Sequence, residues 1–78
     1  MAGTKTPYNE TIQWHSVGDE LPDAETTVLV QAPTLEEPVW LGWYDGCFWF
    51  AVDATDYEDG EVIAWAHIPT GMPTPPPP

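Results

Sequence analysis

The stretch Trp40-Leu-Gly-Trp-Tyr-Asp-Gly-Cys-Phe-Trp-Phe50 decides the fold, because it gathers six aromatic side chains around one Asp-Gly pair. Asp45-Gly46 is a strong signal for a two-residue type I′ turn, which needs positive φ at both central positions. Aromatic and β-branched residues, which favour strands, lie on both sides of this pair. The stretch therefore predicts a β-hairpin with strands at 39–44 and 47–52.

A two-residue turn also fixes the register of the hairpin. The predicted cross-strand pairs are Tyr44 with Cys47, Trp43 with Phe48, Gly42 with Trp49, Leu41 with Phe50, Trp40 with Ala51, and Val39 with Val52. Because side chains alternate along a strand, one face collects only large apolar residues and is the predicted core face: Trp43, Phe48, Leu41, Phe50, Val39 and Val52. On the other face, Trp49 is expected to lie across Gly42.

The rest of the chain predicts more strands and no helix. The further strands are expected at 26–31, 62–67 and, as a short edge strand, 14–17. The core face is expected to be covered from the first of these by Val28 with Val30 or by Thr27 with Leu29, and from the second by Ile63 and Trp65. No window of eleven or more residues shows helical periodicity, and prolines interrupt the best candidates. The sequence thus predicts a mainly β fold, a small antiparallel sheet of four to five strands built on meandering hairpins.

The length of 78 residues allows one domain. We expect residues 12–69 to form it, with a flexible N-terminal arm at 1–11. Residues 70–78 are rich in proline and are expected to lie extended as a tail in the polyproline II conformation or to remain disordered.

Charge is the most unusual property of the composition. Thirteen Asp and Glu residues face a single Lys and no Arg, which gives a formal net charge of −12. Such a chain repels nucleic-acid phosphates and anionic lipid, so we expect no direct binding to either, and attraction to basic surfaces instead. The acids gather in three predicted loops: Asp19, Glu20, Asp23 and Glu25; Glu36 and Glu37; and Asp53, Asp56, Glu58, Asp59 and Glu61. Solvated turns would explain any polar loop, but the near absence of Lys favours a functional acidic surface.

No pattern in the sequence indicates an enzyme, a cofactor or a metal site. Cys47 with His15 or His67 would supply a nucleophile and a base, but no glycine run for an oxyanion accompanies them. The acidic segment 53–61 does not fit a calcium loop, since placing Gly60 at the sixth position puts Thr55 at the first, where an Asp is required. We interpret Cys47 as structural or incidental.

The N-terminus lacks the basic start and apolar run of a secretory signal, and no apolar run is long enough to span a bilayer. One cysteine cannot form an internal disulfide, which suits a reducing compartment. We therefore expect a soluble, cytoplasmic protein.

The order of several short motifs resembles a family. The motifs are Trp14-x-x-Val17-x-Asp19-x-Leu21-Pro22-Asp23, Val28-Leu29-Val30, Gly42-Trp43-Tyr44-Asp45-Gly46 with Trp49, and Trp65-x-x-Ile68-Pro69. Together they resemble a short family of unknown function that is common in bacteriophages and prophages. The resemblance covers residues 14–69 and implies a phage origin, a compact β fold, and residence in the cytoplasm of the host during infection or in a lysogen. Ala64 stands where the family often has His, so no role for that histidine is carried over.

These observations lead to two hypotheses. The first is a phage-encoded acidic inhibitor, an anti-CRISPR-like DNA mimic, that binds the basic nucleic-acid-binding surface of a host defence complex and blocks DNA binding. Carboxylates of the 53–61 and 19–25 loops would stand in for phosphates, and Trp40 and Trp49 would anchor the contact. The alternative is a phage accessory or structural protein that forms a homodimer through Trp40, Trp49 and Tyr44. That face would instead be closed within the chain if Trp14, Val17 and Leu21 fold over it.

Overall fold

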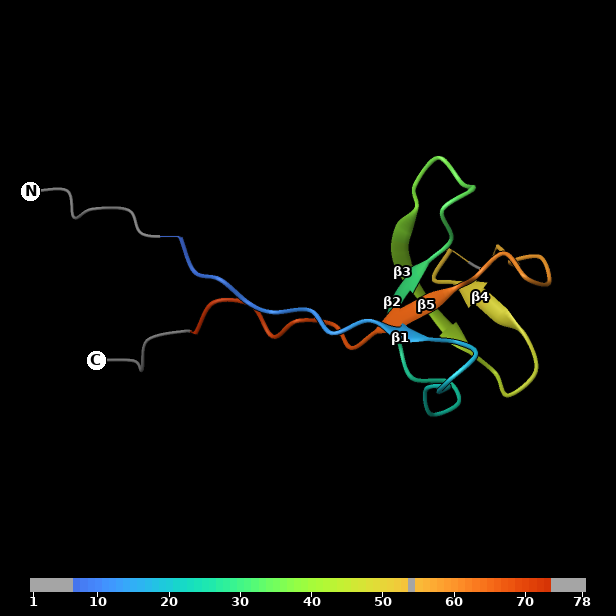
Figure 1. Cartoon of the computed structure of the whole chain (residues 1–78), viewed down its shortest axis with the longest axis horizontal. Coiled ribbons are helices and arrows are strands. Elements are labelled where there is room, and N and C mark those ends of the chain that lie inside the picture. The colour runs from blue at the N-terminus through green and yellow to red at the C-terminus, as the bar shows by residue number, and fades with distance from the viewer. Residues whose placement is uncertain (1–6, 54, 74–78) are drawn as a thin grey trace, which may run out of the picture.

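The chain forms a single antiparallel sheet in a computed structural model, which describes residues 7–53 and 55–73. The five strands are β1 (His15–Ser16), β2 (Val28–Gln31), β3 (Val39–Tyr44), β4 (Trp49–Ala51) and β5 (Ala64–Ala66). Their order across the sheet is β1-β5-β2-β3-β4 (Figure 1). The described ranges contain no helix, and so none that could cross a membrane. The predicted mainly β fold with a small antiparallel sheet is confirmed.

The connectivity differs from a simple meander in one respect. Strands β2, β3 and β4 follow one another, as expected for hairpins, but β5 inserts between β1 and β2 and pairs antiparallel with both. The chain after β4 therefore crosses the sheet before it forms β5. Each observed strand lies within a predicted one, and the bounds of β3 agree with the prediction.

The turn between β3 and β4 lies one residue later than predicted. Tyr44 pairs with Trp49, and the backbone N–H of Asp45 donates to the carbonyl oxygen of Phe48 at 3.0 Å, so Gly46 and Cys47 form the tip. Asp45 Oδ1 accepts hydrogen bonds from the N–H of Cys47 at 2.7 Å and of Phe48 at 2.6 Å. Asp45 thus occupies the first position of the turn, where an Asp side chain caps following amides. Only Gly46 has a positive φ in this turn, at 104°, so the predicted type I′ turn is wrong. The predicted register is wrong as well, because each β3 residue pairs with a residue two positions further along the chain than predicted.

A shift of two residues keeps each side chain on its predicted face, yet the predicted core face is also wrong. The buried cluster is Val28, Val30, Val62 and Trp65, with Val17, Trp49 and Tyr57 packed against it. Through the pairs Val28–Gly42 and Gly42–Ala51 this cluster shares a face with Trp49. The predicted core face points the other way: Phe48 is 65% and Val52 47% exposed. Ile63, also predicted for the core, is exposed.

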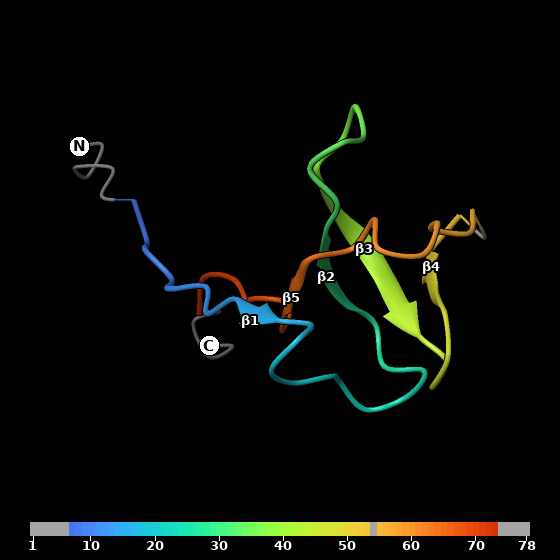
Figure 2. The same ribbon diagram turned by 45° about the vertical axis from the view of Figure 1, so that its right-hand side comes forward.

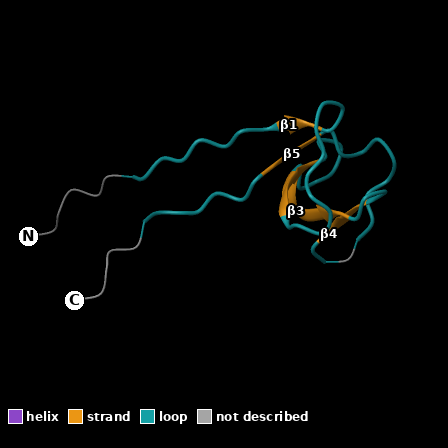
Figure 3. Ribbon diagram, turned by 90° about the horizontal axis from the view of Figure 1, so that it is seen from below, coloured by secondary structure: helices purple, strands orange, loops and turns teal. Residues whose placement is uncertain are grey.

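Curvature explains which face is buried. The sheet curls, so that one side is concave and the other convex (Figures 2 and 3). A Cβ atom added to Gly42 would lie 2.5 Å from the carbonyl oxygen of Phe50 and 3.0 Å from a methyl carbon of Val30. The concave side therefore has room only for a glycine at this position. The space beside Gly42 is occupied by Val30, and not by Trp49 as predicted. The rings of Trp43 and Phe50 stack at a centroid distance of 4.6 Å on the convex side.

Residues 52–63 form a crossover that closes the concave side. It begins along the free edge of β4, where Ala51 N–H donates to Thr55 O at 2.8 Å and Tyr57 N–H donates to Trp49 O at 3.1 Å. It ends at β2, where Ile63 N–H donates to Gln31 O at 3.0 Å. Tyr57 and buried Val62 bring its apolar side chains onto the core cluster. The crossover thereby places the acidic segment 53–61 over the concave face.

The two ends of the described chain run side by side away from the sheet (Figures 1 and 3). The Glu10 carboxylate joins them by accepting hydrogen bonds from Thr70 N–H at 2.9 Å, Thr70 Oγ1 at 3.1 Å and Gly71 N–H at 2.6 Å. Residues 1–6 of the predicted arm and 74–78 of the predicted tail lie outside the described residues. The division into arm, domain and tail stays a prediction.

Candidate functional site

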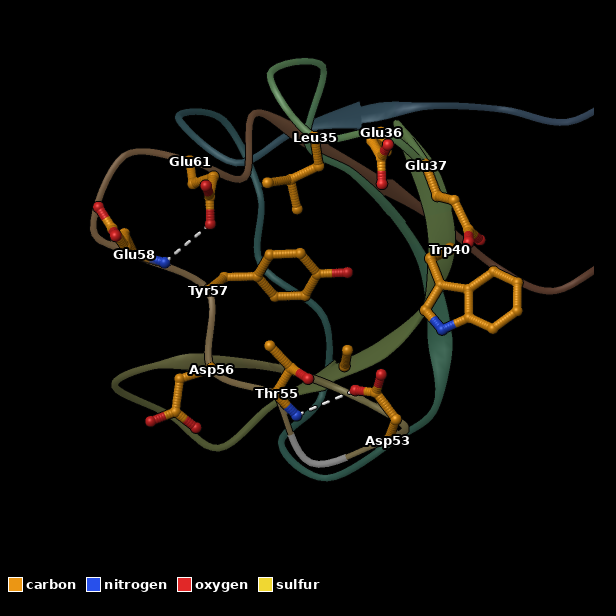
Figure 4. Close-up of a pocket in the computed structure, with 11 residues that line it drawn as sticks. Leu35, Glu36, Glu37, Trp40, Asp53, Thr55, Asp56, Tyr57, Glu58 and Glu61 are labelled. Atoms are coloured by element: carbon orange, nitrogen blue, oxygen red, sulfur yellow. Dashed lines mark hydrogen bonds between the residues drawn. The ribbon is translucent and has the colours of Figure 1, made fainter.

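The concave side carries a pocket with a volume of about 450 Å³, which we call the acidic pocket (Figure 4). Antiparallel pairing explains its position, because β4 ends where β3 begins, so the crossover starts beside the loop 32–38 that precedes β3. Two segments that are distant in sequence thus meet at one end of the sheet. The pocket is lined by Leu35, Glu36, Glu37, Trp40, Ala51, Asp53, Thr55, Asp56, Tyr57, Glu58 and Glu61.

Apolar and aromatic side chains form the inner wall of the acidic pocket. Ala51, which is short and buried, lines the pocket. The ring of Tyr57 extends across the middle of the pocket, with its hydroxyl directed towards the side occupied by Trp40 (Figure 4). Trp40 comes from β3 and is 43% exposed, so part of its indole remains accessible. Leu35 reaches in from the loop before β3.

Two of the carboxylates around the pocket are held by hydrogen bonds. Asp53 Oδ1 accepts a hydrogen bond from Thr55 N–H at 3.0 Å, and Glu61 Oε1 accepts one from Glu58 N–H at 2.9 Å (Figure 4). Hydrogen bonding to the side chain and backbone of Thr55 lowers the pKa of Asp53 below its ordinary value of 3.8. Asp53 is therefore ionised at neutral pH. The hydrogen bonds also restrict where these two charges can move.

The titration of Tyr57 reflects the charge around it. Partial burial raises the pKa of the Tyr57 phenol, and the neighbouring carboxylates of Asp53 and Glu61 raise it further. Negative potential at the phenol disfavours a phenolate and favours any cation placed there. The centre of the acidic pocket is thus electrostatically suited to a positively charged group.

The structure brings five of the predicted partner-binding residues together and separates the others. Asp53, Asp56, Glu58, Glu61 and Trp40 all line the acidic pocket. The acids of 19–25 lie before β2, at the end of the sheet opposite the loop 32–38. The predicted acidic surface therefore consists of two separate groups.

The remaining predicted residues lie around a second groove on the concave side. Asp59 lines this groove together with Trp49, Val17 and Leu21. Trp49 packs against the core cluster and contacts the ring of Tyr44 at a centroid distance of 5.0 Å. Val17 packs on the same cluster, so the chain itself covers part of the predicted aromatic face, while Trp14 is 38% exposed. Trp40 and Trp49 thus lie in different pockets and do not form one contact surface for a partner.

The acids of 19–25 lie in an exposed turn region. Glu25 has a φ of 65°, and its backbone N–H donates to Tyr44 O at 2.7 Å. Glu20 lies beside β1, with its carboxylate 3.5 Å from Nδ1 of His15. Asp19 and Asp23 are exposed like the other two acids of this group. Glu25 lines a separate open hollow with Trp43 and Asp45, and none of the four acids lines the acidic pocket.

Sequence reasoning missed part of the acidic pocket. Tyr57 and Leu35 were not among the predicted site residues, and Glu36 with Glu37 was seen only as a separate loop cluster. Tyr57 is the only aromatic residue within the acidic segment 53–61, which is a signal that it packs inward. The meeting of the two loops follows from the pairing of β3 with β4, and this pairing was predicted.

Uncompensated charge extends over the described surface. All thirteen acids lie within the described residues; Glu61 is half-buried and the other twelve are exposed. Within 7–53 and 55–73 there is no Lys or Arg, and the one close acid–base contact is that of Glu20 with His15. The negative charge of the folded chain is therefore available to an external cation.

The residues considered for catalysis lie at different parts of the sheet. Cys47 is exposed at the tip of the β3–β4 turn. His15 and His67 contact Trp65, at centroid distances of 4.6 and 5.1 Å, near the edge formed by β1 and β5. Among the described residues, no three His, Cys, Asp or Glu side chains converge as metal ligands.

Comparison with protein-family models, curated proteins and solved structures finds no match for this chain. The resemblance to a phage family stays a prediction. Function must therefore be argued from the residues of the chain itself.

Proposed function

We propose that this protein is an acidic inhibitor that binds the basic nucleic-acid-binding surface of a host defence complex, such as a CRISPR effector, and so blocks DNA binding. The phage origin in this proposal comes from the family resemblance alone. In this mechanism the exposed carboxylates occupy the positions at which the target binds backbone phosphates. The protein catalyses no reaction in this mechanism and competes with DNA for the same surface of the target.

One observation carries the proposal, namely that thirteen exposed or half-exposed acids share the described surface with no Lys or Arg. A small soluble domain needs a net charge of only about 2 to 8 for solubility, and a charge of −12 exceeds this. Like charges also destabilise a compact state. A binding role for the excess charge explains why the chain tolerates this cost.

The arrangement of the acids supports the same mechanism. The group at the acidic pocket and the group at 19–25 lie at opposite ends of β2. They are thus spread over the surface of the sheet, as phosphates are spread along a DNA strand. Contacts of this kind are screened by mobile ions, so inhibition should weaken steeply with salt.

The test is competition for DNA on a purified CRISPR effector complex. Fluorescence anisotropy of labelled duplex DNA is followed while the protein is added at low and at high salt. We expect DNA to be displaced, with a midpoint that rises sharply with ionic strength. DNA that stays bound throughout the low-salt titration would overturn the proposal.

Two neutralised variants locate the contact. One carries Asp53→Asn, Asp56→Asn and Glu58→Gln at the acidic pocket, and the other carries Asp19→Asn, Asp23→Asn and Glu25→Gln. Both remove three charges from exposed positions, so they match in net charge. Each should weaken displacement, and a combined variant that displaces DNA as well as the unmodified protein would contradict the mechanism.

A second function is favoured by the convex face. Trp43 and Phe50 stack there while remaining partly exposed, and Val39 beside them is exposed. Such a patch suits self-association of an accessory phage protein. This would use a different surface from the predicted Trp40, Trp49 and Tyr44. Sedimentation decides between the two functions: a dimer that is insensitive to salt and is lost on Trp43→Ser would favour this one.

A further inference from the structure

The shape of the acidic pocket is suited to a discrete chemical group. Its volume of about 450 Å³ lies in the range of roughly 300–1,000 Å³ found for sites that hold small ligands or parts of larger ones. Ala51, a short and buried residue, lines the pocket together with longer side chains. A side chain could therefore enter an open hollow that aromatic and acidic residues line, whereas a phosphate-mimicking surface alone needs no hollow.

The walls of the pocket combine two features that together select an organic cation. Trp40 offers a partly exposed indole, the best aromatic partner for a cation, and Tyr57 adds a second ring. Six acidic residues line the same pocket, namely Glu36, Glu37, Asp53, Asp56, Glu58 and Glu61. Aromatic walls favour a cation with an apolar stem and weak hydration over a strongly hydrated metal ion.

The carboxylates are arranged around the rim and do not gather at one point. Asp53 and Glu61 are held by the backbone N–H groups of Thr55 and Glu58, on two sides of Tyr57 (Figure 4). A planar guanidinium, with five N–H donors in a fixed fork, can stack on a ring while it donates to separated carboxylates. An ammonium group is a compact charge that gains less from such spacing.

We infer that the acidic pocket receives an arginine side chain of the basic partner, with the guanidinium stacked on Trp40 and hydrogen-bonded to carboxylates of the rim. This inference rests on the proposed function for the source of the arginine. The pocket then supplies a specific anchor, and the dispersed acids supply general attraction. Specificity for one basic surface among many follows from the anchor.

The first experiment needs no partner and uses agmatine, a four-carbon chain with a guanidinium at one end and an ammonium at the other, as the probe. The full chain labelled with ¹⁵N is titrated with agmatine, and the indole N–H resonances are followed by NMR. We expect the Trp40 resonance to shift and to saturate, with weaker binding at high salt. N-butylurea, a neutral analogue of similar shape, should leave it unchanged. Agmatine that shifts no indole resonance, or shifts all of them alike, would overturn the inference.

Matched variants assign the effect to the pocket. Trp40→Leu should weaken agmatine binding about two- to thirtyfold through loss of the cation–π contact. Trp14→Leu, which removes a tryptophan of similar exposure outside the pocket, should not. Glu36→Gln with Glu37→Gln leaves the sheet untouched and should weaken binding more than Asp19→Asn with Asp23→Asn, which removes the same charge elsewhere. Equal weakening by both members of either pair would contradict a specific pocket.

A final measurement separates this inference from the proposed function. If agmatine binds as expected and the protein never displaces DNA from the effector, the proposed function fails and the cation site stands. If the protein displaces DNA, but Trp40→Leu and Trp14→Leu displace it equally well, the arginine anchor fails and the acidic inhibitor stands. Support for both requires that Trp40→Leu alone weakens displacement.

Discussion

The two faces of the sheet contrast in a way that side-chain size alone would not suggest. The concave face carries the smallest cross-strand pair, Gly42 with Ala51, and holds the buried core. The convex face carries the stacked rings of Trp43 and Phe50 and remains partly exposed. At the β3–β4 pairing, where the curved sheet leaves little space on the inside, the small pair lies on the buried face and the stacked rings lie on the other.

The same contrast explains why the acidic pocket exists. A sheet whose concave centre was filled by large rings would leave no room for the crossover to lie across it. Because Gly42 and Ala51 have little or no side chain, space remains above them on the concave face. Tyr57 of the crossover lies over this part of the sheet and packs against the core cluster. The acidic segment is thereby fixed beside Trp40. Burial on the concave face and the chemistry of the site thus depend on the same small residues.

The largest expected effect is at Trp65, the buried tryptophan of the concave face, which is 2% exposed. Its indole stacks on His15, and its Nε1–H donates to Glu20 O at 2.9 Å. Trp65→Ala should cost about 3–5 kcal/mol, close to the roughly 3–5 kcal/mol that the core of so small a domain supplies. Circular dichroism should show an unfolded chain at room temperature.

A milder pair of variants keeps this comparison measurable. Trp65→Phe retains a ring but loses the hydrogen bond to Glu20, and should cost about 1–2 kcal/mol in urea unfolding. Trp43→Phe on the convex face should cost less than about 0.5 kcal/mol. Equal losses at the two positions would mean that the convex face is as well packed as the concave one.

The next effect in size is at Gly42. An added Cβ would lie 2.5 Å from the Phe50 carbonyl oxygen, which is backbone and cannot rotate away. Gly42→Ala should therefore destabilise the sheet by about 1–3 kcal/mol, as overpacking does. Gly18→Ala is the control, because its Cβ would meet only Ser16 Oγ at 3.6 Å. The thermal midpoint should fall for the first variant and change little for the second; a fully tolerated Gly42→Ala would show that the strands can separate there.

Much of the fold was predictable from the sequence because strand formation depends on local signals. All five strands were expected, and β3 agreed in its bounds. The Asp45-Gly46 pair gave the position of the hairpin but not its register, since Asp45 acts through its side chain at the first position of the turn. The buried face was not predictable from alternation, because both faces carry large apolar residues and curvature depends on the whole sheet.

The candidate site was predictable only as a set of charges. Acidic loops are visible in the sequence, and five of the predicted residues line the acidic pocket. The predicted pairing of β3 with β4 implied that the loop before β3 and the segment after β4 meet, but the pocket that Tyr57 and Leu35 complete between them emerged only from the three-dimensional arrangement. The predicted partner role of 19–25 stays a prediction, since these acids lie apart from the pocket.

The smallest expected effect concerns pH and tests whether Asp45 fixes the turn between β3 and β4. Hydrogen bonds from the N–H groups of Phe48 and Cys47 lower the pKa of Asp45 below its ordinary value of 3.8. In the unfolded chain Asp45 binds its proton first, so its contribution to stability is complete above about pH 4 and is lost as pH falls through the folded pKa. The sign is opposite to that of the general repulsion, which weakens as the other carboxylates begin to protonate.

The melting temperature should therefore rise on going from pH 7 to about 5, as the self-repulsion of the −12 charge declines. Below about pH 4 it should fall, because protonated Asp45 no longer accepts both hydrogen bonds. Asp45→Asn retains an oxygen acceptor at the first position of the turn and has no proton to gain. Its acid decline should be shallower than that of the unmodified protein in scanning calorimetry. An unchanged acid decline would assign the loss to other carboxylates, with Asp53 and Thr55 next to examine, and would leave Gly46 as the sole determinant of the turn.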